Sequence, residues 1–180
     1  MTATAPNTSR VITLPGDGIG PEIMDAAKRL MTELGGIEWE DRDLGGVSID
    51  NHGTALTDET LESSKNSDAV LLAAVGGPKW DSTNPDDPRP EQGLLGIRKG
   101  LDLFANLRPV KPIPALYGSS PLREERIAGT DLLVVRELTG GIYFGDKSRV
   151  DDVATDVCSY SIAEIERIAR VAFKSARTKV

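Results

Sequence analysis

One segment limits the possible folds of this chain more than any other, the apolar run Asp68-Ala-Val-Leu-Leu-Ala-Ala-Val75. A continuous apolar run of this length is typical of a central parallel strand that is covered on both faces. Gly76-Gly77-Pro78 follows the run directly and ends it. Since such strands occur in sheets with helices on their faces, the run predicts an α/β fold.

The rest of the first hundred residues alternates between strand and helix patterns. Pro21 is suited to the first turn of a helix, and the apolar spacing extends that helix to about Leu34. In chain order, the predicted elements are a strand at 10–14, a helix at 20–34, a strand at 37–44, a helix at 58–65, the strand at 68–75, a Pro- and Asp-rich loop at 81–90 and a helix at 91–103.

The later part of the chain predicts fewer helices. A strand-like segment covers 104–109, and Asp131–Val135 has the composition of a second buried strand, closed by Arg136. The pattern from there to Tyr160 is short, Gly-punctuated and β-like. Ser161-Ile-Ala-Glu164 is a capping-box sequence and starts a helix. The apolar stripe of that helix consists of Ile165, Ile168, Ala172 and Ala176.

Composition excludes several classes of protein. The net charge of −7 is the wrong sign for a nucleic-acid binder, and no apolar run approaches the length of a membrane span. The N-terminus lacks the apolar core of a signal peptide. The single cysteine, Cys158, fits a reducing cytoplasm, and we expect it to be a small buried residue rather than a nucleophile. The only histidine, His52, is predicted to lie in a Gly-rich turn.

The loop Leu14-Pro-Gly-Asp-Gly-Ile-Gly20 lies between a predicted strand and a predicted helix, where phosphate loops occur. It is not a dinucleotide fingerprint, because Pro21 stands where that motif needs its third glycine. Two interpretations stay open. The loop is either a tight strand-to-helix turn or a backbone loop that lines a ligand.

The predicted helix at 91–103 carries an unusual combination of side chains. Its spacing puts Glu91, Leu94, Leu95 and Arg98 on one face. The simpler alternative is an amphipathic helix whose arginine extends to solvent. Gly93 and Gly96 weaken that alternative, since glycine inside a helix costs up to about 1 kcal/mol relative to alanine. Such glycines indicate that another backbone or a ligand comes close.

Two further arginines lie at predicted strand ends: Arg108 follows Phe104-Ala-Asn-Leu107 near the end of the strand-like segment, and Arg136 follows Asp131–Val135. Strand ends of this kind point to the carboxyl edge of a sheet, where α/β enzymes bind ligands. Guanidinium groups suit bidentate capture of carboxylates. Each arginine alone could equally be part of a structural ion pair. Tyr143 is either a half-buried β residue or a proton donor activated by neighbouring cations.

Six segments together are distinctive. They are Leu14-Pro-Gly-Asp-Gly-Ile-Gly-Pro-Glu22, Ala74-Val-Gly-Gly-Pro-Lys-Trp-Asp81, Arg89-Pro-Glu-Gln-Gly-Leu-Leu-Gly-Ile-Arg-Lys99, Phe104-Ala-Asn-Leu-Arg-Pro109, Asp131-Leu-Leu-Val-Val-Arg-Glu-Leu-Thr-Gly-Gly-Ile-Tyr-Phe-Gly145 and Glu164-Ile-Glu-Arg-Ile-Ala-Arg170. In these segments the chain resembles the 3-isopropylmalate dehydrogenase family, from about Val11 to the last residue.

The resemblance implies an α/β, isopropylmalate dehydrogenase-like (non-Rossmann) two-domain fold, of which this chain represents the N-terminal half. It also implies NAD-dependent oxidation and β-decarboxylation of 3-isopropylmalate to 4-methyl-2-oxopentanoate in leucine biosynthesis, with Mg2+ or Mn2+ as Lewis acid. It assigns the substrate carboxylates to Arg98, Arg108 and Arg136, the isopropyl group to Leu94 and Leu95, the nicotinamide side of NAD to Gly77, Pro78, Lys79, Trp80 and Glu91, and protonation of the enolate to Tyr143.

Family members are markedly longer than this chain. The resemblance places the catalytic lysine, the metal-binding aspartates and the adenine-binding loop beyond residue 180, so we predict no metal ligands here and no activity of the chain by itself. It divides the chain into a cofactor-side domain at 1–103 and a substrate and dimerisation domain at 104–180, with a β arm at about 139–160. We expect both domains to be incomplete, and the family protein to be a cytoplasmic homodimer.

Two other functions stay open. The chain could be a non-catalytic binding or regulatory protein that keeps half of a site and pairs with full-length subunits through the arm. It could instead belong to a sister dehydrogenase that acts on isocitrate, homoisocitrate or tartrate. The helix face of Glu91, Leu94 and Leu95 argues against the sister enzymes, because those substrates carry more polar groups at the corresponding position.

Overall fold

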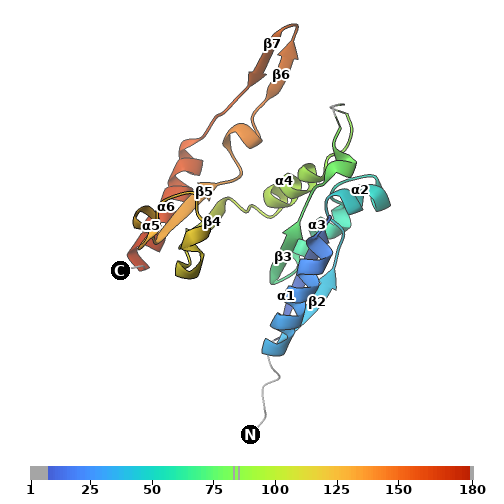
Figure 1. The fold of residues 1–180 in the computed structure, drawn as a ribbon. Coiled ribbons are helices and arrows are strands. Elements are labelled where there is room, and N and C mark those ends of the chain that lie inside the picture. Colours follow the sequence, from blue (N-terminus) through green and yellow to red (C-terminus); the bar gives the residue numbers. More distant parts are fainter. Residues whose placement is uncertain (1–7, 83, 85, 179–180) are drawn as a thin grey trace. The chain divides into compact units, whose positions relative to one another are not determined.

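The structure is a computed structural model that describes residues 8–82, 84 and 86–178. The chain divides into two compact units, Met1–Leu101 and Asp102–Val180, which we call unit 1 and unit 2 (Figure 1). Each unit mixes helices with strands, which confirms the predicted α/β class. The predicted domain boundary at 103/104 and the incompleteness of the two domains stay predictions.

Unit 1 is built on a parallel sheet with the strand order β2-β1-β3. The strands are β1 (Ser9–Gly16), β2 (Ile37–Asp41) and β3 (Ala69–Ala74). The apolar run that predicts a central strand forms β3, which lies at the edge of this sheet and is only half-buried. Instead, β1 is central, and its residues Ile12 and Leu14 are fully buried. The prediction for 68–75 was right about the strand and wrong about its place.

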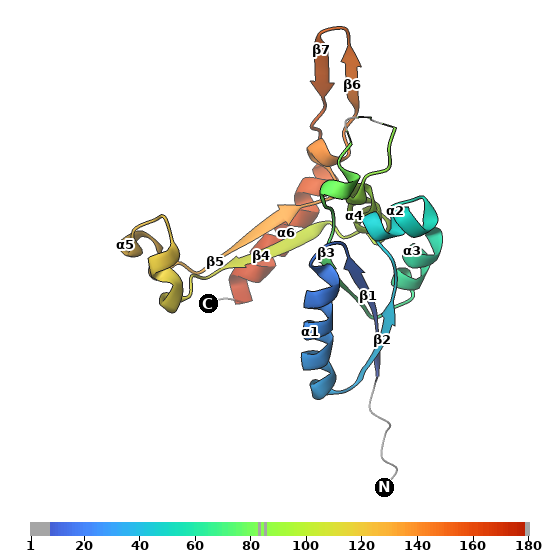
Figure 2. The same ribbon diagram turned by 45° about the vertical axis from the view of Figure 1, so that its right-hand side comes forward.

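Helices cover both faces of this sheet. They are α1 (Gly20–Leu34), α2 (Gly46–His52), α3 (Asp58–Lys65), the short 3-10 helix η1 (Pro78–Trp80) and α4 (Pro90–Gly100). The helix α1 packs along β1 and β3 on one face (Figure 2). On the other face, Ile12, Leu14, Leu44 and Ile97 form the hydrophobic core, packed against residues that include Leu61 of α3. This core fixes the position of α4.

The prediction was also wrong at two other places in unit 1. The second strand ends at Asp41 rather than Leu44, although Leu44 itself is a fully buried core residue. His52 does not lie in a turn; it is the last residue of α2, which ends at Gly53 in the left-handed conformation with φ 74°. A helix of 7 residues is too short to produce a recognisable apolar period.

Unit 2 contains two separate antiparallel strand pairs and one long helix. The first pair joins β4 (Ala105–Val110) to β5 (Leu132–Glu137), and the second is the hairpin of β6 (Lys147–Val150) and β7 (Val153–Asp156). The remaining elements are η2 (Pro114–Ser119), α5 (Glu124–Ile127), η3 (Gly141–Tyr143) and α6 (Ile162–Thr178). The predicted β-like arm after Arg136 therefore contains the hairpin.

The strand β5 differs from its prediction as a buried strand. It extends to Glu137, so Arg136 lies inside the strand instead of closing it. Leu132 and Val134 are 45% and 46% exposed, since one face of the antiparallel pair carries no covering element of the described chain. Apolar composition could not distinguish a strand covered on both faces from one covered on a single face.

The start of α6 confirms the capping box. The Glu164 N–H donates to the Ser161 hydroxyl oxygen over 3.2 Å, and the Ser161 N–H donates to the Glu164 carboxylate over 2.6 Å. The predicted apolar stripe is only partly right. Ile168 and Ala172 are half-buried, whereas Ile165 and Ala176 are exposed.

Candidate functional site

The loop between β1 and α1 is tied to β3 and to α2 by the side chain of Asp17. This carboxylate is buried and accepts hydrogen bonds from the backbone N–H groups of Gly46, Val47 and Gly76, each over 2.8 Å. Asp17 therefore joins three segments that are far apart in the sequence. This geometry favours the interpretation of the loop as a structural turn.

Asp17 was not among the residues predicted to have a function. An aspartate enclosed by glycines between a strand and a helix is a signal for hydrogen bonding to backbone N–H groups. That signal does not say which distant N–H groups the carboxylate reaches, so the tertiary link could not be read from it.

The segment predicted to contact NAD is anchored to α2. Lys79 Nζ lies 2.5 Å from a carboxylate oxygen of Asp50, and Trp80 Nε1 donates to the other oxygen over 3.2 Å. The hydrogen bond from Lys79 holds the pKa of the Asp50 carboxyl below its ordinary value. The Trp80 ring packs on the backbone of Gly46. Lys79 and Trp80 are thus held by a common carboxylate.

Two of the predicted cofactor residues share one pocket. Trp80 and Glu91 line it together with Asp81, Ser82 and Arg89. A carboxylate oxygen of Glu91 also reaches the backbone at Gly76, where an added Cβ would lie 2.8 Å away. The end of β3 and the start of α4 therefore meet at this pocket.

The helix α4 has a buried face and a more exposed face. Pro90, Gly93 and Ile97 are buried, whereas Leu94, Leu95 and Arg98 are half-buried and Glu91 is exposed. A Cβ at Gly93 would overlap the carbonyl oxygen of Ala55, so a backbone does come close to this glycine, as predicted. The residues predicted to contact substrate lie off the face that packs into the core.

In unit 2, the register of the β4–β5 pair places two predicted substrate arginines on one face. Arg108 lies opposite Val134, and Arg136 lies opposite Asn106. The two opposed pairs are two residues apart on each strand. Directly opposed residues of an antiparallel pair project from the same face, as do residues two apart. Arg108 Nε donates to Asn106 Oδ1 over 2.6 Å, which links the two positions.

This arrangement corrects the reason given for these arginines. They lie within an antiparallel pair, not at the carboxyl edge of a parallel sheet. The rule that places ligands at strand ends therefore does not apply to them. Their shared face is a consequence of the strand register, which the sequence did not specify.

Tyr143 lies beside Arg136. It ends η3, is 43% exposed, and its hydroxyl oxygen accepts a short hydrogen bond from the Arg136 guanidinium. The guanidinium carbon is 5.0 Å from the centroid of the Tyr143 ring. The cation next to the phenol that an acid–base role requires is thus present. In unit 2 the structure brings Arg108, Arg136 and Tyr143 into one neighbourhood.

Behind this neighbourhood lies a charged pair that the sequence did not indicate, Glu137 and Arg167. Arg167 of α6 donates to the Glu137 carboxylate over 2.8 Å, and the Glu137 side chain is 9% exposed. Burial opposes ionisation of this carboxyl, but hydrogen bonds from the Gly140 N–H, Thr139 and Arg167 outweigh it and keep the pKa of Glu137 below its ordinary value. The alternation of β5 puts Glu137 on the face opposite Arg136.

Cys158 is exposed, contrary to its prediction as a buried residue. It lies in the segment between β7 and α6. Burial of the Tyr160 hydroxyl and the neighbouring Cys158 raise the pKa of Tyr160.

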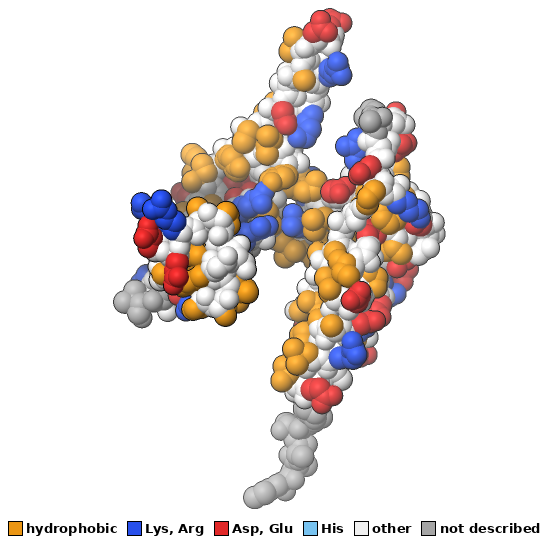
Figure 3. Space-filling view, viewed as in Figure 1, with side chains coloured by type: hydrophobic (Ala, Val, Ile, Leu, Met, Phe, Trp, Pro, Cys, Tyr) orange, Lys and Arg blue, Asp and Glu red, His pale blue; other side chains and the backbone are white. Residues whose placement is uncertain are grey.

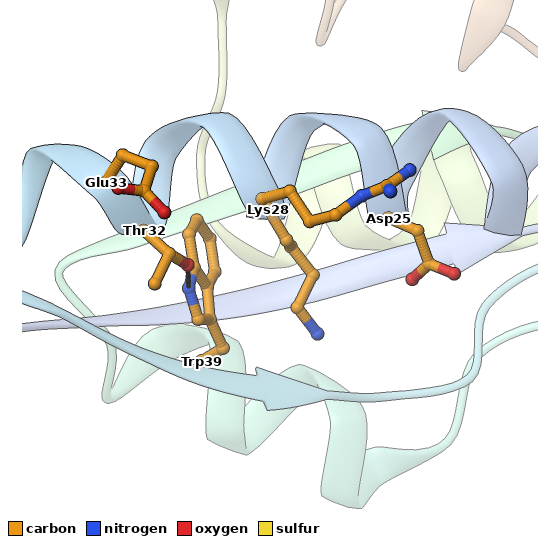
Figure 4. Close-up of a pocket in the computed structure, with 6 residues that line it drawn as sticks. Asp25, Lys28, Thr32, Glu33 and Trp39 are labelled. Atoms are coloured by element: carbon orange, nitrogen blue, oxygen red, sulfur yellow. Dashed lines mark hydrogen bonds between the residues drawn. The ribbon is translucent and has the colours of Figure 1, made fainter.

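A further pocket lies between α1 and β2, away from the predicted residues (Figure 4). Trp39 Nε1 donates to Thr32 Oγ1 over 3.0 Å, and Lys28 of the same pocket pairs with Asp41 over 2.8 Å. Lys28 and Trp39 of this pocket therefore have partners within the protein.

The described ranges 8–82, 84 and 86–178 contain neither a candidate metal site nor a candidate membrane-spanning helix. This part of the chain contains no group of three or more His, Cys, Asp or Glu side chains placed to hold a metal ion. Within the same residues, no helix is both long and apolar enough to cross a bilayer.

Comparison with known proteins gives consistent matches over the described region. Residues 10–180 match the family model described as isocitrate/isopropylmalate dehydrogenase. A 3-isopropylmalate dehydrogenase from Staphylococcus saprophyticus is 51% identical over 176 residues, which cover 94% of this chain and 50% of that protein. The enzyme of the same name from Bacillus licheniformis is 49% identical over 181 residues, covering 94% and 49%.

Two solved structures share the fold. A β-decarboxylating dehydrogenase from Thermococcus kodakarensis has a TM-score of 0.69 and 33% identity, covering 96% of this chain and 46% of that one. The isocitrate dehydrogenase of Methylococcus capsulatus has a TM-score of 0.72 and 28% identity, covering 96% and 48%. The chain thus spans about half the length of the curated relatives it matches.

Proposed function

Because the chain belongs to the isocitrate/isopropylmalate dehydrogenase family, we propose that it serves the NAD-dependent oxidative decarboxylation of 3-isopropylmalate in leucine biosynthesis. The observation that supports this most is the neighbourhood in unit 2, where Arg108 and Arg136 share one strand face and Tyr143 meets Arg136. Two arginines on one strand face can bind the carboxylates of a dicarboxylate substrate. The tyrosine hydroxyl beside them can give that substrate a proton. The relatives that are about half identical to this chain are named 3-isopropylmalate dehydrogenase, and this name favours 3-isopropylmalate as the substrate.

We assign the substrate carboxylates to Arg98, Arg108 and Arg136. Guanidinium forks bind carboxylates in a bidentate manner, and each such charge-assisted bond contributes about 1.5–3 kcal/mol. Leu94 and Leu95 precede Arg98 on the half-buried part of α4, and we assign the branched alkyl group of the substrate to them. Isocitrate carries a charged carboxymethyl group in place of that alkyl group, so its third carboxylate would face the two leucines.

We assign NAD to the segment Gly77, Pro78, Lys79 and Trp80 together with Glu91. The pocket that Trp80 and Glu91 share supports this assignment, as does the anchoring of Lys79 and Trp80 to Asp50. NAD held by these residues would supply the hydride acceptor for oxidation of the substrate hydroxyl. The residues of this chain bind and orient the cofactor.

A divalent metal, Mg2+ or Mn2+, acts as Lewis acid in the proposed reaction. The described part of this chain offers no ligand cluster for it, so we assign it no residue here and no step through this chain. We assign the protonation of the enolate after decarboxylation to Tyr143. The Arg136 guanidinium stabilises the phenolate that this transfer leaves behind.

We also propose that the protein acts as a cytoplasmic homodimer. The hairpin of β6 and β7 exposes Val150 and Val153, at 67% and 65%, among charged side chains (Figure 3). Exposed apolar residues on an extended hairpin suit a contact with a partner chain.

The function can be tested in a chimaera in which residues 10–180 replace the matching half of the Bacillus licheniformis enzyme. We expect NADH formation with 3-isopropylmalate and much less with isocitrate. In this chimaera, Arg98→Lys should lower kcat/KM at least about tenfold, which is about 1.4 kcal/mol. A preference for isocitrate, or unchanged kinetics in Arg98→Lys, would contradict the assignment.

A further inference from the structure

The Gly140–Tyr143 turn is built so that its backbone leaves little freedom to Tyr143. Gly141 has φ +69°, a left-handed conformation that favours glycine, and a Cβ there would overlap the Tyr160 hydroxyl. A Cβ on Gly140 would lie 2.9 Å from a carboxylate oxygen of Glu164. The turn thus packs tightly on Tyr160 and on the first turn of α6.

The Glu137 carboxylate determines how the chain enters this turn. One of its oxygens accepts hydrogen bonds from the N–H groups of Thr139 and Gly140, over 2.8 and 2.7 Å. The other accepts from the Thr139 hydroxyl over 2.9 Å and from Arg167 over 2.8 Å. Each carboxylate oxygen therefore accepts two hydrogen bonds. Three of the four bonds come from Thr139 and Gly140, the residues that begin the turn.

Arg167 is held in turn by several groups of unit 2. Its guanidinium stacks on the Phe104 ring, 4.7 Å from the centroid, and contacts the Thr139 hydroxyl. It also lies 3.4 Å from the Asp102 carboxylate. Since Arg167 belongs to α6 and Glu137 to β5, their ion pair links the helix to the strand that carries Arg136.

On these grounds, and resting on the function proposed above, we propose that the Glu137–Arg167 pair is a positioning unit. It fixes the turn after β5 and thereby holds the Tyr143 hydroxyl against the Arg136 guanidinium. Neither residue is assigned a contact with substrate. Their effect on the reaction passes through the Arg136–Tyr143 contact.

The test uses the 180-residue chain labelled with carbon-13 at the tyrosine ring carbon that bears the hydroxyl. The chain has 3 tyrosines, which are Tyr117, Tyr143 and Tyr160, so single Tyr→Phe variants assign the resonances. An Arg136→Gln variant removes the donor and defines the shift that loss of the contact produces at Tyr143. In Glu137→Gln we expect Tyr143 to move most of the way to that position, while Tyr117 stays.

The matched control is Glu166→Gln, an exposed glutamate of α6 that lies 3.6 Å from Arg170 on the same helix. We expect its Tyr143 resonance to stay at the wild-type position. A purely structural role for Glu137 would lower stability but leave the Tyr143 resonance in place in the folded protein. That result overturns the proposal, as does an equal shift in Glu166→Gln or no shift in Arg136→Gln.

If circular dichroism shows that Glu137→Gln does not fold, Arg167→Lys decides the question. Lysine keeps the charge and loses the planar group that reaches Glu137, Thr139 and Phe104 together. A shifted Tyr143 resonance in Arg167→Lys supports the proposal, and an unshifted one overturns it. These spectra need no turnover, so a failed substrate test in the chimaera would remove the proposed function without changing this result.

Discussion

The two units differ in what holds them together. Unit 1 buries Val11, Ile12, Leu14, Leu44 and Ile97 around a parallel sheet. In the described part of unit 2, Leu138 is the one hydrophobic residue that is buried, and many large apolar side chains are exposed. Unit 2 instead has the Glu137–Arg167 pair, the capping box of Ser161 and two small antiparallel pairs.

This difference indicates how each set of proposed site residues is positioned. In unit 1, Leu94, Leu95 and Arg98 lie on α4, which apolar packing fixes, so their geometry should tolerate changes in salt and pH. Lys79 and Trp80 depend in addition on the Asp50 carboxylate. In unit 2, Arg136 and Tyr143 depend on hydrogen bonds and one buried ion pair. Both tryptophans, Trp39 and Trp80, lie in unit 1 and the 3 tyrosines lie in unit 2, so the units can be followed separately.

The largest effect should come from the core of unit 1. Leu14→Ala removes a side chain that is fully buried, and we expect a loss of about 2–5 kcal/mol in the free energy of unfolding. Tryptophan fluorescence during urea denaturation measures it. The control is Leu30→Ala, which changes a residue that is 71% exposed and should alter stability by less than about 0.5 kcal/mol. An equal loss in the tyrosine signals of unit 2 would show that the two units do not unfold separately.

A smaller loss is expected from the buried carboxylate of unit 1. Asp17→Asn replaces one of two acceptor oxygens by an NH2 group that faces backbone donors, and this should cost about 1.5–3 kcal/mol. The same tryptophan signal reports it. Asp25→Asn, at an exposed position of α1, serves as the control. If the two variants are equally stable, the three hydrogen bonds do not contribute as described.

The close approach of α4 to the backbone gives a third comparison. Gly93→Ala puts a methyl group against the Ala55 carbonyl and should destabilise unit 1 by about 1–3 kcal/mol, despite the better helix propensity of alanine. In Gly96→Ala the new Cβ lies 3.1 Å from the Leu56 Cδ2, which can move. We expect Gly96→Ala to be nearly neutral in the same denaturation. A reversed order would contradict the packing of α4.

The smallest effect is the pH dependence that Glu137 gives to the stability of unit 2. Because the folded pKa of Glu137 is lowered, its contribution is fully present above the unfolded value of about 4.3. It is lost as the pH falls through the folded value, where the unfolded chain holds more protons than the folded one. The stability difference between the wild type and Glu137→Gln should therefore shrink on acidification, measured by urea denaturation with the tyrosine signals. Glu166→Gln should show no such trend, and a constant difference for Glu137→Gln would contradict the prediction.

Local patterns predicted the elements well where one segment carried the whole signal. The bounds of α1 and α3, the capping box of α6 and the close contact at Gly93 are all confirmed. The predictions were wrong about the place of β3 in its sheet, the exposure of β5 and the burial of Cys158. Each of these depends on which distant element covers a segment, and composition does not record that.

The site shows the same limit. Arg108, Arg136 and Tyr143 were predicted from the sequence as candidate site residues. That they lie close together results from the register of β4 and β5 and from the turn after β5, which the sequence did not predict. Glu137 and Arg167 were missed because they are 30 positions apart in the sequence, and no local pattern pairs them. The assignment of all these residues to substrate and cofactor stays a prediction.

The Asp17 carboxylate has a consequence for the order in which unit 1 folds. Its three donors lie at positions 46, 47 and 76, so its hydrogen bonds can be complete only after α2 and the end of β3 have reached the first loop. Contacts that form this late lie on the native side of the transition state. Asp17→Asn should therefore speed unfolding while leaving the rate of refolding almost unchanged, so this carboxylate acts mainly on how long the folded unit lasts.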